Sequence, residues 1–138
     1  MKLRHLNISA LSLLAFGFAT VGIVVPASAH HSFSAEYDSK KVVTLTGTVT
    51  KFEWMNPHVY FYVDVDSADG KTENWAFEMG PPNGLQRSGW TKNTMKVGDE
   101  VTVNGTLAKD GSKQVNVRTV TTADGKSLGA ASSEGKGQ

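Results

Sequence analysis

Near its middle, this 138-residue chain reads His58-Val59-Tyr60-Phe61-Tyr62-Val63-Asp64-Val65-Asp66. Apolar side chains alternate along this stretch with polar and aromatic ones, so that Val59, Phe61, Val63 and Val65 share one face of an extended backbone. Strict alternation indicates a β-strand with one face in a hydrophobic core and the other outside it. We therefore expect a mostly β protein built around this strand.

Turn and strand signals continue on both sides of the alternating stretch. Asp69-Gly70 predicts a tight hairpin turn, followed by a returning strand over 72–79. Upstream, residues 42–54 are rich in Val and Thr, and Gly47 within them marks a bend or bulge. The remaining expected features are a short helix from the prolines at 81 and 82 to about Ser88, apolar anchors at Leu85, Trp90, Met95 and Val97, and strands over 101–107 and 114–122.

Three strands, a short helix and two further strands predict an all-β fold, a small five-stranded OB-like barrel with its helix between strands three and four. Residues 96–105 also resemble the entry to the fourth strand of OB-folds. A small β-sandwich is the alternative, although five strands are few for that architecture. The barrel domain is expected over 42–122. A polar lead-in over 30–41 precedes it, and a small, polar, disordered tail over 123–138 follows.

The first 29 residues have the features of a signal peptide. Lys2 and Arg4 are followed by an apolar run from Ile8 to Val25. Pro26 then breaks the run, and an Ala-x-Ala cleavage site ends at Ala29. We therefore expect export to the bacterial periplasm and a mature chain that begins at His30. The competing interpretation is an uncleaved membrane anchor, because the run is close to the shortest that spans a bilayer.

Composition excludes several classes of function. The chain has 14 basic and 13 acidic residues, and the signal segment holds two of the former and none of the latter, which leaves a mature charge of −1. A near-neutral domain offers no footprint for nucleic acid or for an anionic membrane. With no cysteine, the chain has neither disulfides nor thiolate chemistry.

Several motifs resemble an uncharacterised family of exported bacterial proteins, the domain of unknown function 6152. The motifs are His30-His31-Ser32-Phe33, Leu45-Thr46-Gly47-Thr48-Val49, Trp54-Met55-Asn56-Pro57-His58, Asn74-Trp75-Ala76-Phe77-Glu78, Gly84-Leu85 and Gly89-Trp90. The resemblance covers nearly the whole mature chain. It implies an exported OB-like domain and brings no activity with it.

The mature histidines predict a metal site. Cleavage after Ala29 leaves the α-amine on His30, where amine and imidazole together form a chelate. His58, with His31 as a further candidate, would complete a nitrogen set of the kind that copper favours. Other groups considered are the thioethers of Met55 and Met79 for Cu(I), and Glu78 or Asp38 as hydrogen-bond acceptors behind the ligands. The alternative is that His30 and His31 form a plain polar terminus and that His58 binds backbone in a turn.

An aromatic group predicts a second kind of site. Tyr60 and Tyr62 share the outer face of the alternating strand, with Trp54 nearby in sequence. OB-folds bind ligands over this region by stacking. In the competing interpretation these rings instead pack against Phe33 and Tyr37 of the lead-in.

No spacing of carboxylates, and no nucleophile motif, indicates catalysis. We therefore expect a small exported binding protein that is not an enzyme, with copper as its cofactor. The alternative is an OB-fold module without metal that binds a ligand or protein. In either case the partner is an unknown protein or small molecule, without nucleic acid or membrane after cleavage, and the chain is expected to be a monomer.

Overall fold

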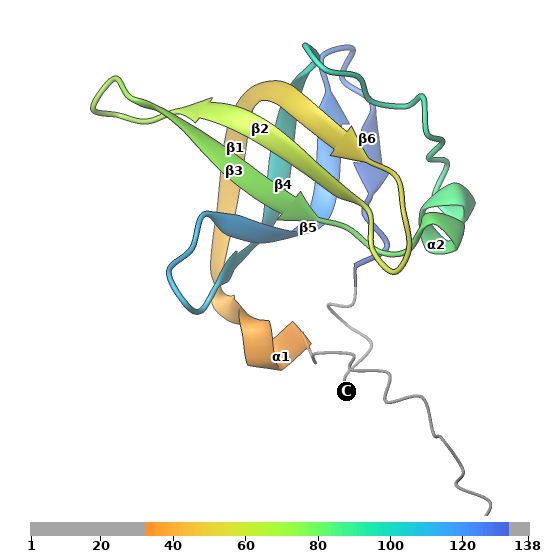
Figure 1. Cartoon of the computed structure of the whole chain (residues 1–138), viewed down its shortest axis with the longest axis horizontal. Helices are drawn as coiled ribbons and strands as arrows, with labels where there is room; N and C mark the ends of the chain where they lie inside the picture. Colours follow the sequence, from red (N-terminus) through yellow and green to blue (C-terminus); the bar gives the residue numbers. More distant parts are fainter. Residues whose placement is uncertain (1–32, 133–138) are drawn as a thin grey trace, which may run out of the picture.

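The structure, a computed structural model, describes residues 33–132 (Figure 1). The predicted signal peptide, the lead-in residues 30–32 and the last six residues of the predicted tail lie outside this range. No helix within it is long and apolar enough to cross a membrane. The elements in chain order are α1 (Phe33–Glu36), β1 (Tyr37–Glu53), β2 (Tyr60–Asp66), β3 (Thr72–Glu78), α2 (Pro82–Arg87), β4 (Glu100–Ala108), β5 (Gln114–Thr122) and β6 (Ser127–Gly129).

The strands form one six-stranded sheet in the order β3-β2-β1-β4-β5-β6. An additional pairing joins β3 to β5, so hydrogen bonds run in a ring through β1, β2, β3, β5 and β4. All pairings are antiparallel except β3–β5, which is parallel. Strand β1 has a neighbour on each side in this ring, since its first part pairs with β4 and its last part pairs with β2.

The prediction of a mostly β fold with a short helix between the third and fourth strands is confirmed. The predicted count of five strands is wrong by one. Residues 127–129, expected in a disordered tail, form β6 against Thr119–Thr121 of β5. The first strand also begins earlier than expected, at Tyr37 instead of residue 42, because Tyr37 already pairs with Ala108 of β4.

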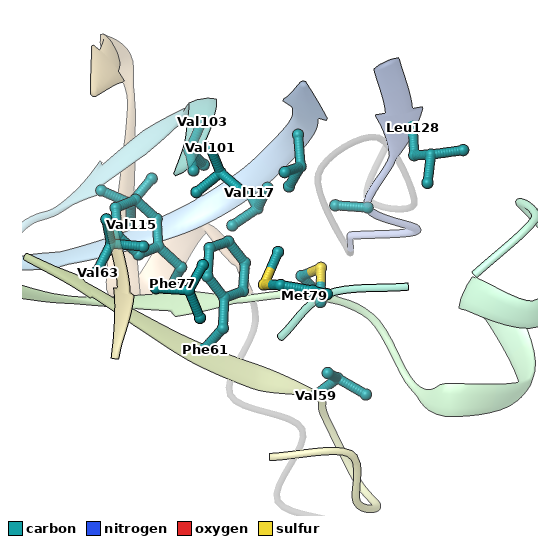
Figure 2. Close-up of a cluster of buried hydrophobic side chains, with 14 of the residues drawn as sticks. Val59, Phe61, Val63, Phe77, Met79, Val101, Val103, Val115, Val117 and Leu128 are labelled. Carbon is teal, nitrogen blue, oxygen red and sulfur yellow. The ribbon is translucent and has the colours of Figure 1, made fainter. Parts of the chain in front are cut away.

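The core lies inside the ring and contains the apolar faces of the strands (Figure 2). The four residues predicted to face it from β2 and its approach, Val59, Phe61, Val63 and Val65, are all buried. Phe61 stacks on Phe77 of β3 with ring centroids 5.0 Å apart. Burying each such ring contributes roughly 1.5–3 kcal/mol, so this pair anchors the β2–β3 hairpin to the rest of the core.

Gly47 allows β1 to pass close to β2. A Cβ atom at this position would lie 2.1 Å from the carbonyl oxygen of Asp64. The register shift of the strand pair lies slightly later, between Val49 and Lys51. The glycine predicted to mark a bend therefore serves a close approach of two backbones.

The segment after α2 is tied to the core by Trp90 and Met95, which are buried, as is Leu85 of α2. The indole Nε1 of Trp90 donates to the carbonyl oxygen of Gly129 at 2.9 Å. Val97, expected as a third anchor of this segment, is instead 67% exposed, because it lies in the turn that leads into β4.

Candidate functional site

A histidine and a buried carboxylate meet where β2 begins and β3 ends. His58 follows the cis peptide bond between Asn56 and Pro57, and Glu78 is the last residue of β3. The Nδ1 atom of His58 lies 2.5 Å from Oε1 of Glu78. The side chain of Glu78 is 6% exposed and that of His58 is 29% exposed. Glu78 therefore fixes one ring nitrogen of His58, and among the described residues no hydrogen bond to Nε2 is seen.

Two further side chains hold the other oxygen of Glu78. The Tyr37 hydroxyl at the start of β1 donates to Oε2, and Nε2 of Gln114 lies 3.5 Å from the same oxygen. Gln114 also donates to the Tyr37 hydroxyl oxygen at 2.6 Å. Burial, followed by the hydrogen bond to Glu78, raises the pKa of Tyr37 well above its ordinary value. Side chains of β1 and β5 thus bind the buried carboxylate of β3, as buried charges require.

Tyr60 belongs to the same cluster. It lies opposite Glu78 in the β2–β3 register. Desolvation, followed by the negative charge of Glu78, raises the pKa of the Tyr60 phenol above its ordinary value. The neutral phenol is therefore the form that this environment stabilises.

Two more buried polar residues, Asn116 and Thr106, lie beside Glu78 across neighbouring strands of the sheet. Asn116 of β5 is paired in register with Glu78 on one side and with Thr106 of β4 on the other. Asn116 is 1% exposed and Thr106 is fully buried, although the alternating Val115 and Val117 face the core. The Oδ1 atom of Asn116 is buried without a hydrogen-bond partner. Leaving such a buried oxygen unpaired costs free energy, and among the described residues it is the one buried side-chain polar atom without a hydrogen-bond partner.

Next to this cluster is an open cavity of about 560 Å³. It lies between α1, the beginnings of β1 and β2, and the hairpin that joins β4 to β5; Figure 1 shows that hairpin beside α1. Its lining includes Glu36, Tyr37, Tyr60, Lys109, Asp110 and Gln114. A cavity of this size is in the range of small-molecule sites.

In the structure, the three aromatic residues predicted to bind a ligand have different partners. Tyr60 faces Glu78, whereas the Tyr62 hydroxyl lies 3.3 Å from Oε2 of Glu53. Trp54 packs edge-on against Phe52, with ring centroids 6.0 Å apart. Only Tyr60 lines the cavity described above.

The alternative interpretation was that these rings pack against Phe33 and Tyr37 of the lead-in, two residues that in the structure contact each other. Phe33 stacks on Tyr37 with ring centroids 5.6 Å apart. Tyr37, which we expected only as packing, is instead a hydrogen-bonding member of the Glu78 cluster.

Of the predicted metal ligands, His30 and His31 lie outside the described residues. Within residues 33–132, no group of three or more His, Cys, Asp or Glu could hold a metal ion. Met79 is a core residue with 1% exposure, whereas Met55, in the loop before His58, is 54% exposed. Of the two carboxylates considered as acceptors behind the ligands, Glu78 contacts His58, and Asp38 instead accepts from the backbone of Lys40.

Sequence reasoning missed Gln114 and Asn116. Both lie in a strand whose alternate residues are valines, and that pattern predicts a solvated outer face for them. The signal that could have found them is the choice of carboxamides at two successive outward positions, in a strand where Thr and charged residues are the more usual outer-face choices.

One protein-family model matches most of the described chain. The model for DUF6152, described as a family of unknown function, matches residues 19–118. The chain belongs to this family. The match includes His58, Glu78, Gln114 and Asn116 and ends before β6. No curated protein and no solved structure matches the chain.

Proposed function

We propose that this DUF6152 protein is an exported periplasmic binding protein that holds one copper ion between the N-terminus of the mature chain and His58. The ligands are the α-amine and imidazole of His30 and the Nε2 atom of His58, with His31 as a further nitrogen donor. The protein is not an enzyme in this proposal, and it acts as a monomer.

The observation that carries the proposal is the contact between His58 and Glu78. Histidines that bind metals commonly donate their other ring N–H to a carboxylate, which fixes the tautomer and the ring orientation. In this chain the carboxylate is itself buried and held by Tyr37 and Gln114. A histidine that merely caps a turn needs no such support.

The beginning of the described chain supports the role of His30. Phe33 stacks on Tyr37, and Tyr37 binds the same carboxylate as His58. A segment of three residues, the length of 30–32, can extend about 10 Å from this point. In the proposal, these three residues bring the mature terminus back to the histidine with which it shares the metal.

Copper is the metal that suits this donor set best. An amine and two or three imidazoles are nitrogen ligands, and Cu(II) binds such ligands more tightly than the other divalent first-row metals do. The amine must lose its proton before it binds, and an unperturbed α-amine has a pKa of about 8. We therefore expect copper affinity to fall as the pH is lowered below neutrality.

The test is a Cu(II) competition titration of protein purified from the exported fraction, after mass spectrometry has established its first residue. A second chain carries Gly-Ser-Gly ahead of His30, which moves the amine away and leaves no histidine among the first three positions. We expect this extension and His58→Ala each to weaken copper binding by at least about tenfold, and Glu78→Gln to weaken it by about tenfold.

Glu53→Gln is the matched control for Glu78→Gln, because Glu53 is also a strand carboxylate bound to a tyrosine but has Lys51 and Tyr62 as its partners instead of His58. It is expected to leave copper affinity unchanged. Equal affinity in the processed and extended chains, or a natural first residue other than His30, would overturn the proposal.

We also propose that the five-strand ring is a closed OB-type barrel. The order β1-β2-β3-β5-β4, the parallel β3–β5 pairing and the helix between β3 and β4 support this assignment. The alternative function, a metal-free module that binds a ligand or protein through Trp54, Tyr60 and Tyr62, is supported only at Tyr60, which lines the cavity.

A further inference from the structure

One buried oxygen next to Glu78 lacks a hydrogen-bond donor. The Oδ1 atom of Asn116 is buried and, among the described residues, has no hydrogen-bond partner. Asn116 is 1% exposed and pairs in register with Glu78, the residue that binds His58. Because a buried carboxamide oxygen without a donor costs free energy, this atom points to a donor that the described residues do not supply.

The beginning of the described chain is held beside the same carboxylate. The Tyr37 hydroxyl donates to Glu78, and Phe33 stacks on the Tyr37 ring with centroids 5.6 Å apart. The Nζ atom of Lys109, which directly follows β4, donates to the carbonyl oxygen of Ser34 in α1 at 2.6 Å. Figure 1 shows α1 beside the hairpin that joins β4 to β5. The chain that precedes α1 therefore departs from the neighbourhood of the Glu78 cluster.

From these contacts we infer that Asn116 positions the mature N-terminus, its Oδ1 atom accepting a backbone N–H of residues 31–32. The inference rests on the proposed function, because it gives the terminal ligand His30 a fixed approach to the metal. Glu78 and Asn116, neighbours on adjacent strands, then support the two parts of the donor set. Glu78 orients His58, and Asn116 orients the segment that carries His30. Asn116 is a positioning residue and does not touch the metal.

The test uses the metal-free mature protein, in which NMR relaxation reports the mobility of the amides of residues 31–32. We expect order parameters of about 0.85, as in rigid backbone, for the unaltered protein and values below about 0.6 for Asn116→Leu, which removes the oxygen and keeps the size of the side chain. Cu(II) affinity of this variant is expected to fall by about tenfold.

Asn104→Leu is the matched control. This asparagine also lies on a strand, in β4, but its carboxamide donates to the Val43 carbonyl and to the Thr44 hydroxyl. We expect Asn104→Leu to leave residues 31–32 rigid and copper affinity unchanged.

A second measurement needs no substitution of Asn116. A chain that begins at Phe33 lacks the proposed donor, and we expect the carboxamide resonances of Asn116 to shift in it while those of Asn104 stay. A chain that ends at Ser132 is expected to leave both sets unchanged.

Mobile amides at residues 31–32 in the unaltered protein, equal mobility in Asn116→Leu and Asn104→Leu, or an Asn116 shift caused only by the chain that ends at Ser132 would overturn the inference. The NMR measurements are made without copper, so these outcomes leave the copper proposal standing. Rigid residues 31–32 in a protein that fails to bind copper would count against the copper proposal alone.

Discussion

The carboxylate of Glu78 is removed from water on the outer face of the sheet, where strands normally place solvated groups. Tyr37, Gln114 and His58 satisfy its oxygens from three other parts of the chain. A buried charge that loses one such partner costs more than the bond itself contributes, because its desolvation remains uncompensated. Removing a single hydrogen-bonding group from this cluster is therefore expected to lower the free energy of unfolding.

Tyr37→Phe removes one hydroxyl from the cluster and leaves the ring. We expect the free energy of unfolding to fall by about 1–3 kcal/mol, because Glu78 stays buried with one donor fewer. The measurement is urea denaturation followed by tryptophan fluorescence. Tyr62→Phe is the control, since its hydroxyl lies 3.3 Å from the more exposed Glu53, and its effect is expected to stay under about 0.5 kcal/mol. Equal losses in both variants would contradict this role of Tyr37.

The phenols of Tyr37 and Tyr60 predict how stability depends on pH in alkali. Their folded-state pKa values are raised above the ordinary value of 10.0. Above that pH the unfolded chain loses phenolic protons that the folded chain keeps. The stabilisation is therefore complete below pH 10 and is lost as the pH rises, by up to about 1.4 kcal/mol per pH unit for each phenol.

The measurement is the near-ultraviolet absorbance of tyrosinate during alkaline titration, recorded together with circular dichroism. We expect Tyr37 and Tyr60 to ionise only as the fold is lost, and Tyr37→Phe to remove one of these delayed ionisations. Delayed ionisation of the same number of tyrosines in that variant would rule out Tyr37 as one of the two.

At the scale of elements, β1 is the strand on which the architecture depends. It is 17 residues long and pairs with β4 along its first part and with β2 along its last part. The transition between partners occurs at Thr48, which is paired with residues of both strands. Gly47 lies immediately before this point and permits the close passage of the two backbones.

Gly47→Ala places a methyl group only 2.1 Å from the carbonyl oxygen of Asp64. We expect the free energy of unfolding to fall by about 2–3 kcal/mol, because backbone must move to relieve the overlap. Gly129→Ala is the control in another strand, since a Cβ atom there meets nothing within 4 Å. Denaturation midpoints compare the two variants, and similar small effects in both would show that β1 and β2 separate easily.

For the whole molecule, the C-terminal segment completes the packing at one end of the ring. Strand β6 pairs with β5, Ala130 is buried, and the Gly129 carbonyl accepts from Trp90. The Gly80 amide also donates to the Ala130 carbonyl at 2.8 Å. This segment thus connects β5, the loop before α2 and the segment after it.

A chain that ends at Gly125 loses these contacts. We expect its free energy of unfolding to fall by about 2–4 kcal/mol, because apolar burial and the Trp90 hydrogen bond are both lost. A chain that ends at Ser132 keeps every described contact and serves as the control. Thermal unfolding of the two chains and the full one gives the comparison; a shortened chain as stable as the control would show that β6 contributes little.

How far the sequence predicts this molecule depends on the range of the interactions. Alternation around Phe61 and the Asp69-Gly70 turn are local signals, and both gave correct elements. Strand β6 was missed because only three residues pair, in a stretch whose Gly, Ser and Ala composition is typical of a tail. Tyr37, Gln114 and Asn116 could not be assigned to the site, because they meet Glu78 only through strand pairings between distant segments.

The ring of pairings has a further consequence for what a backbone break would do. The turn at residues 67–71 separates β1 and β2 from the later strands. Two strand pairings, β2–β3 and β1–β4, join the part of the chain before this turn to the part after it. A chain nicked in this turn is therefore expected to stay together as a non-covalent heterodimer of its two fragments. The turn is accordingly a suitable place to divide the protein into two fragments that fold only when they bind each other.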